Sequence, residues 1–174
     1  MAKHVEAYIG LGSNLGDREA SLRFALQSMA ELSQVWVEAV SRVYETDAVG
    51  PGVQGPYLNA AARLRCECSP QSLLDGLLAI ELKAGRDRSG DVERWGPRIL
   101  DLDLLFYGED CIEQPGLSIP HPRLHERAFV LEPLCDLAPD YVHPREGVSL
   151  IELARRLPDS SALRVWPESL EVPG

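Results

Sequence analysis

Residues 93–108 read Glu-Arg-Trp-Gly-Pro-Arg-Ile-Leu-Asp-Leu-Asp-Leu-Leu-Phe-Tyr-Gly. Apolar residues flank and separate Asp101 and Asp103, so this segment is predicted to form a buried strand. Strand residues two apart point to the same face, which brings the two carboxylates side by side with their Cα atoms about 6.6 Å apart. Two negative charges that close on an apolar strand require a positive partner.

The sequence leaves two kinds of partner open for this acidic pair. Mg²⁺ is typically held by one or two carboxylates and by the phosphate oxygens of a substrate. Alternatively, the aspartates form structural ion pairs with Arg94 and Arg98. Arginine also suits bidentate capture of phosphate. Four arginines lie just upstream on a predicted polar loop, namely Arg86, Arg88, Arg94 and Arg98.

Hydrophobic periodicity predicts the rest of the core. Three further strands are expected, at residues 6–11, 35–44 and 58–66, the last of them half exposed. Two helices are expected, at residues 18–32 after Asp17 and at residues 70–85 after Ser69. With the strand at Asp101 the order is β-α-β-β-α-β, which is the ferredoxin-like α+β arrangement of an antiparallel sheet with two helices on one face.

Several features lie outside this core. A long loop is expected over residues 45–56, and loops of that length are often functional. A C-terminal extension is expected to contain a hairpin, two short helices and a loose tail, at residues 111–119, 128–137, 150–157 and 158–174. No repeat or linker marks a second domain, so residues 1–174 are expected to form one domain with a core over about residues 5–145.

Composition restricts the class of partner. The net charge of −10 argues against a general surface for nucleic acid or an anionic membrane, since both need a basic field. No signal peptide or apolar run long enough to span a bilayer is found. The C-x-C pair at Cys66 and Cys68 lacks a second matching pair, which disfavours zinc. A cytoplasmic protein with reduced thiols is therefore expected. A monomer or weak homo-oligomer is also expected, although this does not follow from composition.

Two short motifs have structural interpretations that compete with functional ones. Residues 10–16 contain three glycines but match neither the dinucleotide nor the P-loop pattern, so a tight strand-to-helix turn is favoured. His121 and His125 are four apart, but prolines flank His121, which disfavours a helical metal pair. His121 is better suited to donate a hydrogen bond to phosphate. His4 and His143 are expected at the surface.

Aromatic residues next to loops could cover a flat ligand. Tyr57, Trp95 and Phe129 have such positions, although any one of them alone is more often a core residue. Asn59, Glu81 and Arg127 are similarly weak signals when taken singly. Together with the two aspartates and the arginines, they indicate a site for phosphates, a metal and a flat heterocycle.

At this level of detail the sequence resembles the 6-hydroxymethyl-7,8-dihydropterin pyrophosphokinase family over roughly residues 5–145. The string Arg94-Trp95-Gly96-Pro97-Arg98-Ile99-Leu100-Asp101-Leu102-Asp103 is the most specific segment. The other segments that carry the resemblance follow in order, at residues 8–16, 55–61, 81 with 85–88, 119–123 and 126–131. The resemblance implies transfer of the terminal diphosphate of ATP to the pterin hydroxymethyl oxygen, with release of AMP, in folate biosynthesis.

The resemblance also assigns residues. The catalytic group is expected to be Arg86, Arg88, Asp101 and Asp103, with the two aspartates as ligands of two Mg²⁺ ions. The pterin is expected to contact Thr46, Val49, Tyr57, Asn59, Trp95 and Phe129. ATP is expected to contact Glu81, Arg88, Trp95, Arg98, Leu104, Ser118, His121 and Arg127.

Some positions depart from the family pattern. Asp47 and Ala48 replace a common Pro-Pro pair, so the loop is expected to be less rigid. Gly116 and Pro122 replace a basic and an aromatic residue near the nucleotide, which removes two side-chain contacts. Two rival functions remain, namely a nucleotide-binding module without catalysis and a kinase that transfers only the γ-phosphate. Product analysis separates both from a pyrophosphokinase.

Overall fold

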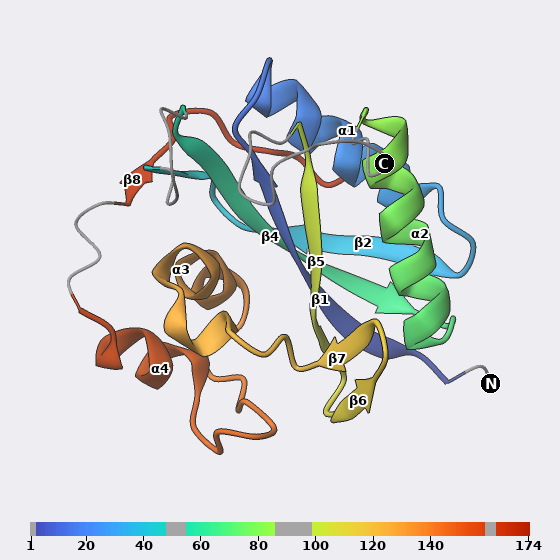
Figure 1. Cartoon of the computed structure of the whole chain (residues 1–174), viewed down its shortest axis with the longest axis vertical. Coiled ribbons are helices and arrows are strands. Elements are labelled where there is room, and N and C mark those ends of the chain that lie inside the picture. Colours follow the sequence, from blue (N-terminus) through green and yellow to red (C-terminus); the bar gives the residue numbers. More distant parts are fainter. Residues whose placement is uncertain (1–2, 48–54, 86–98, 159–162) are drawn as a thin grey trace.

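An antiparallel sheet runs through the centre of the protein (Figure 1). The computed structural model describes residues 3–47, 55–85, 99–158 and 163–174. The strand order is β5-β1-β4-β3-β8, and β2 also pairs with β4. These strands are β1 (Val5–Ser13), β2 (Val35–Val40), β3 (Tyr44–Thr46), β4 (Tyr57–Cys66), β5 (Asp101–Tyr107) and β8 (Arg164–Val165). This order confirms the predicted ferredoxin-like core.

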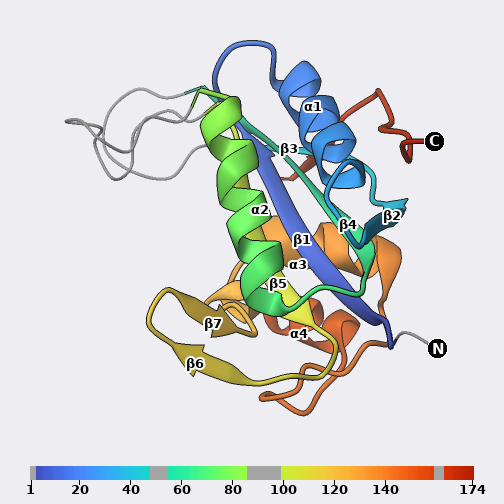
Figure 2. The same cartoon turned by 90° about the vertical axis from the view of Figure 1, so that its right-hand side faces the viewer.

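Helices cover both faces of the sheet (Figure 2). The first pair, α1 (Arg18–Ala30) and α2 (Pro70–Lys83), lies on one face, as predicted. The second pair, α3 (Ala128–Leu137) and α4 (Leu150–Arg156), covers the other face. The side chains of the sheet accordingly divide into two buried clusters, one against each pair of helices. A small separate hairpin consists of β6 (Ile112–Gln114) and β7 (Leu117–Ile119), also as predicted.

Local capping explains why the first two helices begin where the sequence predicted. The Asp17 side chain accepts a hydrogen bond from the backbone N–H of Ala20 at 3.0 Å. The Ser69 hydroxyl accepts from the backbone N–H of Ser72 at 3.1 Å, and Pro70 occupies the first turn of α2. These side chains satisfy amide groups that have no partner within the helix. Gly85 follows the end of α2 with a φ of 97°, which favours glycine.

The predicted strand at residues 35–44 is interrupted in the structure. β2 and β3 both pair with β4, but residues 41–43 between them are not in a strand. Here the Ser41 hydroxyl, in place of a backbone carbonyl, accepts the N–H of Ala61 at 2.8 Å. The side chain therefore replaces one hydrogen bond of the ladder and permits the chain to break its strand conformation.

The middle of β4 is more buried than predicted. Residues 58–62 are all buried, because α1 packs against one face of this strand while α3 packs against the other. Intermediate exposure is limited to Tyr57 at the start of the strand and to Arg63 and Arg65 toward its end. The alanines at positions 60–62 are small enough for elements to pack on both faces of the strand. Because alanine is only weakly apolar, the sequence pattern did not distinguish a strand buried on both faces from a half-exposed one.

The expectation of a loose C-terminal tail is wrong for residues 163–170. β8 pairs antiparallel with β3, and Leu170 is buried in the cluster beneath α1 and α2. The expectation of a surface position for His143 is also wrong, since only 2% of this residue is exposed. Its Nδ1 atom accepts the backbone N–H groups of Arg145 and Glu146, each at 3.1 Å. Burial lowers the pKa of His143.

No helix in the described parts of the chain is long and apolar enough to cross a bilayer. All four cysteines fall within the described residues and are free thiols.

Candidate functional site

A row of residues crosses the sheet from β5 to β3. Asp101 lies opposite Gly12, and Gly12 lies opposite Asn59 on its other side. Residues paired directly across strands point to the same face, so Asp101 and Asn59 share a face with only a glycine between them. A Cβ atom on Gly12 would lie 3.3 Å from Asn59 Oδ1. The glycine therefore keeps the surface between the two side chains open.

Asp103 lies next to Asp101 along the same face. It is opposite Gly10 on β1, is exposed, and belongs to the outermost strand on its side of the sheet. Asp101 has intermediate exposure, while Leu102 and residues 104–107 are buried. The structure thus confirms the predicted apolar strand that carries two acids on one face. Arg94 and Arg98, which were the alternative partners to a metal ion, lie outside the described residues.

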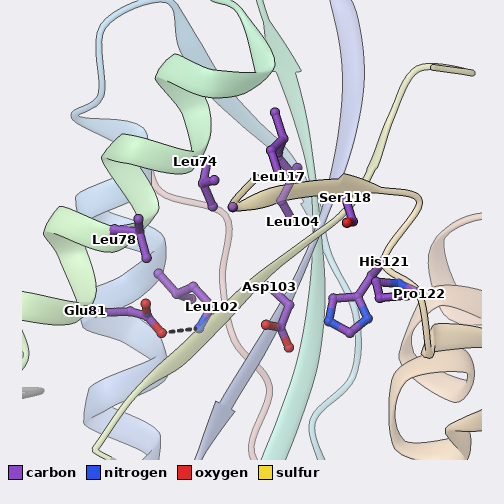
Figure 3. A pocket seen from close by; sticks show the side chains of 11 residues that line it. Leu74, Leu78, Glu81, Leu102, Asp103, Leu104, Leu117, Ser118, His121 and Pro122 are labelled. Atoms are coloured by element: carbon purple, nitrogen blue, oxygen red, sulfur yellow. Dashed lines mark hydrogen bonds between the residues drawn. The ribbon is translucent and has the colours of Figure 1, made fainter. Parts of the chain in front are cut away.

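Glu81, in the last turn of α2, joins that helix to the acidic strand. Its side chain is buried, with 1% of the residue exposed. Its Oε2 atom accepts the backbone N–H of Leu102 at 3.0 Å (Figure 3). Leu102 separates the two aspartates, so this hydrogen bond fixes the backbone between them. It also satisfies an amide on the outer side of β5, where no further strand follows within the described residues.

A cavity of about 360 Å³ lies at this edge, between α2, β5 and β7 (Figure 3). Leucines from all three elements form its apolar wall, and a smaller number of polar side chains point toward it. The apolar residues are Leu74, Leu78, Leu102, Leu104 and Leu117, the polar ones Glu81, Asp103, Ser118 and His121, and Gly116 and Pro122 complete the lining. Such a mixture suits a flat ligand with polar edges.

A backbone hydrogen bond anchors His121, which lines this cavity. Its N–H donates to the Leu105 carbonyl oxygen at 3.0 Å. Leu105 is the extra residue of a β-bulge, because Leu104 and Phe106 oppose the consecutive residues Ile9 and Tyr8. Burial lowers the pKa of His121, and the nearby Asp103 carboxylate opposes this shift. The Nδ1 atom accepts the Arg123 N–H at 3.4 Å, which leaves the proton of the neutral ring on Nε2.

A second group of predicted residues meets where β3 pairs with β4. The Asn59 side chain donates from Nδ2 to Thr46 Oγ1 at 2.9 Å, and each residue is only 7% exposed. Thr46 is also the register partner of Tyr57, the first residue of β4. Three of the residues expected to contact a pterin, Thr46, Tyr57 and Asn59, are therefore neighbours.

The beginning of α3 carries two more predicted residues. Arg127 is the N-cap residue of this helix, and its guanidinium carbon lies 5.8 Å from the centroid of the Phe129 ring. Farther along α3, Asp136 accepts a hydrogen bond from the Tyr44 hydroxyl at 2.8 Å and forms an ion pair with Arg42 at 2.9 Å. These contacts attach the helix that bears Phe129 to the start of β3.

Five predicted site residues lie outside the described residues, namely Val49, Arg86, Arg88, Trp95 and Arg98. The structure also adds cavity residues that the sequence reasoning did not assign, including Leu74 and Leu78. Leu74, Leu78 and Glu81 follow one another at spacings of four and three. A helical pattern extended to include the acid would have placed all three on one face of α2.

Within the part of the chain that the structure describes, no group of three or more His, Cys, Asp or Glu side chains could hold a metal ion. Asp101 and Asp103 supply carboxylate oxygens, which are hard donors, on one face of β5. Gly10 and Gly12 opposite them add no side chain that would fill the adjacent space. This donor set fits Mg²⁺, provided that the remaining ligands come from water and a phosphate-bearing substrate.

A family model and several related proteins all assign this chain to the same family. Residues 8–139 match the family model described as 7,8-dihydro-6-hydroxymethylpterin-pyrophosphokinase. Proteins named 2-amino-4-hydroxy-6-hydroxymethyldihydropteridine pyrophosphokinase are similar to this chain. One from Synechocystis sp. is 46% identical, over 92% of this chain and 79% of the relative. One from Haemophilus influenzae is 39% identical, over 94% and 99%. One from Pseudomonas aeruginosa is 44% identical, over 87% and 91%.

Solved structures support the fold. A Plasmodium falciparum HPPK-DHPS structure with pterin and p-hydroxybenzoate has a TM-score of 0.70 and 16% sequence identity. The alignment covers 90% of this chain but only 44% of that longer one. The shared architecture therefore corresponds to a part of those fused proteins.

Proposed function

Since this chain belongs to the 7,8-dihydro-6-hydroxymethylpterin-pyrophosphokinase family, we propose that Asp101 and Asp103 are the centre of its diphosphate transfer from ATP to the pterin. The enzyme acts in folate biosynthesis and releases AMP as the second product. The observation that carries the assignment of the site is the pair of acids on one face of β5, beside the cavity that contains Glu81, Ser118 and His121.

Asp101 and Asp103 would hold two Mg²⁺ ions together with the phosphate oxygens of ATP. Bound there, the metal supplies neutralisation of the phosphate charge. The chain itself fixes the spacing of the two carboxylates through the strand, and Glu81 fixes the peptide between them. Arg86, Arg88 and Arg98 would add guanidinium groups to the phosphates, since arginine matches their geometry.

The cavity next to β5 would hold the nucleotide. Its leucine wall, which includes Leu104, suits the flat faces of a purine, and its volume of about 360 Å³ lies within the range of small-molecule sites. Ser118, His121 and Asp103 line the same cavity, so Ser118 and His121 would be available to the ribose or the phosphates. Arg127 and Trp95 complete the proposed set of ATP contacts.

The neighbours Thr46, Tyr57 and Asn59 would bind the pterin. Asn59 has an amide that can pair with the polar edge of the heterocycle, and Tyr57 and Phe129 offer rings to its faces. Val49 and Trp95 belong to this set by family resemblance. Two strand spacings of about 4.8 Å separate Asn59 from Asp101, about 10 Å in total. A pterin held at Asn59 would therefore extend its hydroxymethyl arm toward the phosphates, as attack on the β-phosphorus requires.

Product analysis tests the reaction. The protein is incubated with Mg·ATP and 6-hydroxymethyl-7,8-dihydropterin, and we expect AMP and the pterin diphosphate. Release of ADP would identify a γ-phosphate kinase, and nucleotide binding without turnover would identify a binding module. Either result would contradict the proposal.

A substitution tests the acidic pair. Asp103→Asn removes one negative charge and one metal-binding oxygen, so we expect kcat to fall by a factor of about 10² or more, as when a charge-stabilising group is lost. Asp110→Asn, in the exposed turn after β5, is the matched control and should keep wild-type activity. Equal activity of Asp103→Asn and the control would remove Asp103 from the reaction.

Three broader features belong to the same proposal. Residues 1–174 would form a single catalytic domain that works in the cytoplasm as a monomer or weak homo-oligomer. Sedimentation at several protein concentrations would test the last point, because a stable oligomer would keep its mass on dilution.

A further inference from the structure

The C-terminal residues lie against the strand that carries Thr46. In β8, Val165 pairs with Tyr44 and Arg164 pairs with Glu45. The backbone N–H of Trp166 then donates to the Val43 carbonyl at 2.8 Å. We refer to residues 163–170 as the C-terminal clasp. It covers the side of β3 that faces away from β4, at the opposite edge of the sheet from β5 (Figure 1).

Trp166 connects the clasp to Arg18. The indole Nε1 atom donates to Glu19 at 2.7 Å, and the Arg18 guanidinium carbon lies 5.1 Å from the centroid of the Trp166 rings. From this position Arg18 Nη1 donates to Glu45 Oε2 at 2.8 Å and to the Pro56 carbonyl oxygen at 2.9 Å. One guanidinium therefore joins β3 to the residue that immediately precedes β4.

A second arginine reinforces β3 from the clasp. Arg164 forms ion pairs with Glu45 at 3.2 Å and with Asp47 at 3.3 Å. Glu45 thus lies between two guanidinium groups, and the hydrogen bond from Arg18 is the main cause of its lowered pKa. Isolated exposed ion pairs contribute little to the free energy of folding. Here, however, two arginines share one carboxylate of intermediate exposure, and both act on the same short strand.

β3 depends on such support because it contains only three residues, Tyr44–Thr46. A strand this short at the edge of a sheet would open readily by itself. Its last residue, Thr46, accepts the hydrogen bond that orients the buried amide of Asn59. The clasp is in turn anchored in the core, where Leu170 is 6% exposed and Trp166 packs against the cluster beneath α1 and α2.

We propose that the C-terminal clasp is a positioning element for the pterin, with Trp166 and Arg18 as its principal positioning residues. It keeps β3 in register with β4, so that Thr46 holds the Asn59 amide in the orientation that reads the edge of the heterocycle. This inference rests on the proposed function. Loss of the clasp should weaken pterin binding and leave ATP binding almost unchanged, because the clasp and the nucleotide cavity lie at opposite edges of the sheet.

Steady-state kinetics of two tryptophan variants test the clasp. Trp166→Ala should raise the KM for the pterin about tenfold, which corresponds to about 1.4 kcal/mol, and should leave the KM for ATP within about twofold. Trp166→Phe should give an intermediate value, since it keeps a ring beneath Arg18 but lacks the donor to Glu19. The matched control is Trp36→Ala. Trp36 is 41% exposed on β2 and lies beneath Arg65 at 4.1 Å, so it is also a tryptophan stacked on arginine.

Equal increases in both KM values, or the same increase in Trp36→Ala, would overturn the inference, because they would indicate a general loss of structure. If Trp166→Ala does not fold, Arg164→Ala replaces it, with Arg156→Ala as control because Arg156 forms an exposed ion pair with Glu152. Arg164→Ala should produce a smaller increase of the same selective kind, and an unchanged pterin KM would overturn the inference.

A second measurement separates this inference from the proposed function. Wild-type protein that released no AMP would contradict the function, and the clasp would then be judged by amide hydrogen exchange at residues 44–46. Faster exchange there in Trp166→Ala than in Trp36→Ala would support it. Equal exchange in the two variants would overturn it.

Discussion

At the scale of single residues, the hydrogen bond between the Glu81 carboxylate and the Leu102 amide joins helix α2 to strand β5. A buried acid is costly unless hydrogen bonds compensate for the loss of water. The Leu102 N–H supplies one such bond, at a position where an edge strand would otherwise leave an amide without a strand partner. The same bond sets the peptide that separates Asp101 from Asp103, so a residue of α2 helps to define the geometry of the acidic pair.

Removal of this acid should destabilise the protein. In Glu81→Ala the buried Leu102 amide loses its partner, and an unsatisfied buried group costs about 1–3 kcal/mol. Urea unfolding would measure the loss as a lower midpoint. Gln71→Ala, at an exposed site on the same helix, should change the free energy of unfolding by less than about 0.5 kcal/mol. Coincident unfolding curves for the two variants would show that the Glu81 contact does not contribute.

The spacing of Asp101 and Asp103 was predictable because it depends only on the period of a strand. The Glu81 contact was not, because it links residues 21 positions apart in different elements. His143 illustrates a related difficulty. Histidine occurs at the surface and in cores, and only the folded backbone brings two N–H groups to its Nδ1 atom.

At the scale of elements, α3 is attached to β3 by polar contacts in addition to apolar packing. Asp136 accepts hydrogen bonds from Arg42, which precedes β3, and from Tyr44, which is the first residue of β3. Burial is the main cause of the raised pKa of Tyr44, and the hydrogen bond to Asp136 raises it further. The tyrosine therefore remains a neutral donor, and the helix that carries Phe129 is held against the strand that carries Thr46.

Loss of the contacts between α3 and β3 should weaken pterin binding and lower the stability of the fold. Asp136→Ala removes a charge-assisted pair of contacts, which are worth about 1.5–3 kcal/mol when a charged group takes part. We expect a lower urea midpoint and a higher KM for the pterin. Asp140→Ala, at an exposed position after α3, serves as the control. A pterin KM equal to that of the control would show that α3 is positioned by apolar packing alone.

Elements with local signals were predictable, and elements without them were not. Asp17, Ser69 and Pro70 mark helix starts through bonds to their own helix, so α1 and α2 begin where expected. β8 has only two residues, and its Arg164 contacts Glu45 across 119 positions of sequence. No periodicity can develop over two residues, which is why this segment was expected to be a loose tail.

At the scale of the whole molecule, the sheet separates two apolar clusters, and this arrangement controls access to the thiols. Cys66 is fully buried, and burial raises its pKa to about 12. Cys111 is exposed on the segment before β6. The overall topology follows from the order of the elements, whereas the covering of the second face by α3 and α4 required the structure, since short apolar segments do not specify which face they bury.

The rates at which the cysteines of the folded protein are labelled test this difference in burial. At pH 8 we expect a thiolate-selective reagent to modify Cys111 rapidly and Cys66 only on unfolding, because the Cys66 thiol stays protonated and covered. The raised pKa also means that the folded state keeps a proton that the unfolded state releases above about pH 8.5. Its contribution to stability is thus complete below that pH and is lost as pH rises toward 12. Peptide mapping after labelling would test the order, and rapid modification of Cys66 in native protein would contradict it.

The two edges of the sheet differ in a way that bears on self-association. The β3 edge is paired with β8, whereas β5 has no strand on its outer side within the described residues. Open strand edges invite pairing with a second copy of the chain. Here Glu81 occupies the Leu102 N–H, His121 occupies the Leu105 carbonyl, and Asp101 and Asp103 place like charges along the same strand. The acids proposed for catalysis are therefore also expected to discourage one molecule from extending the sheet of another.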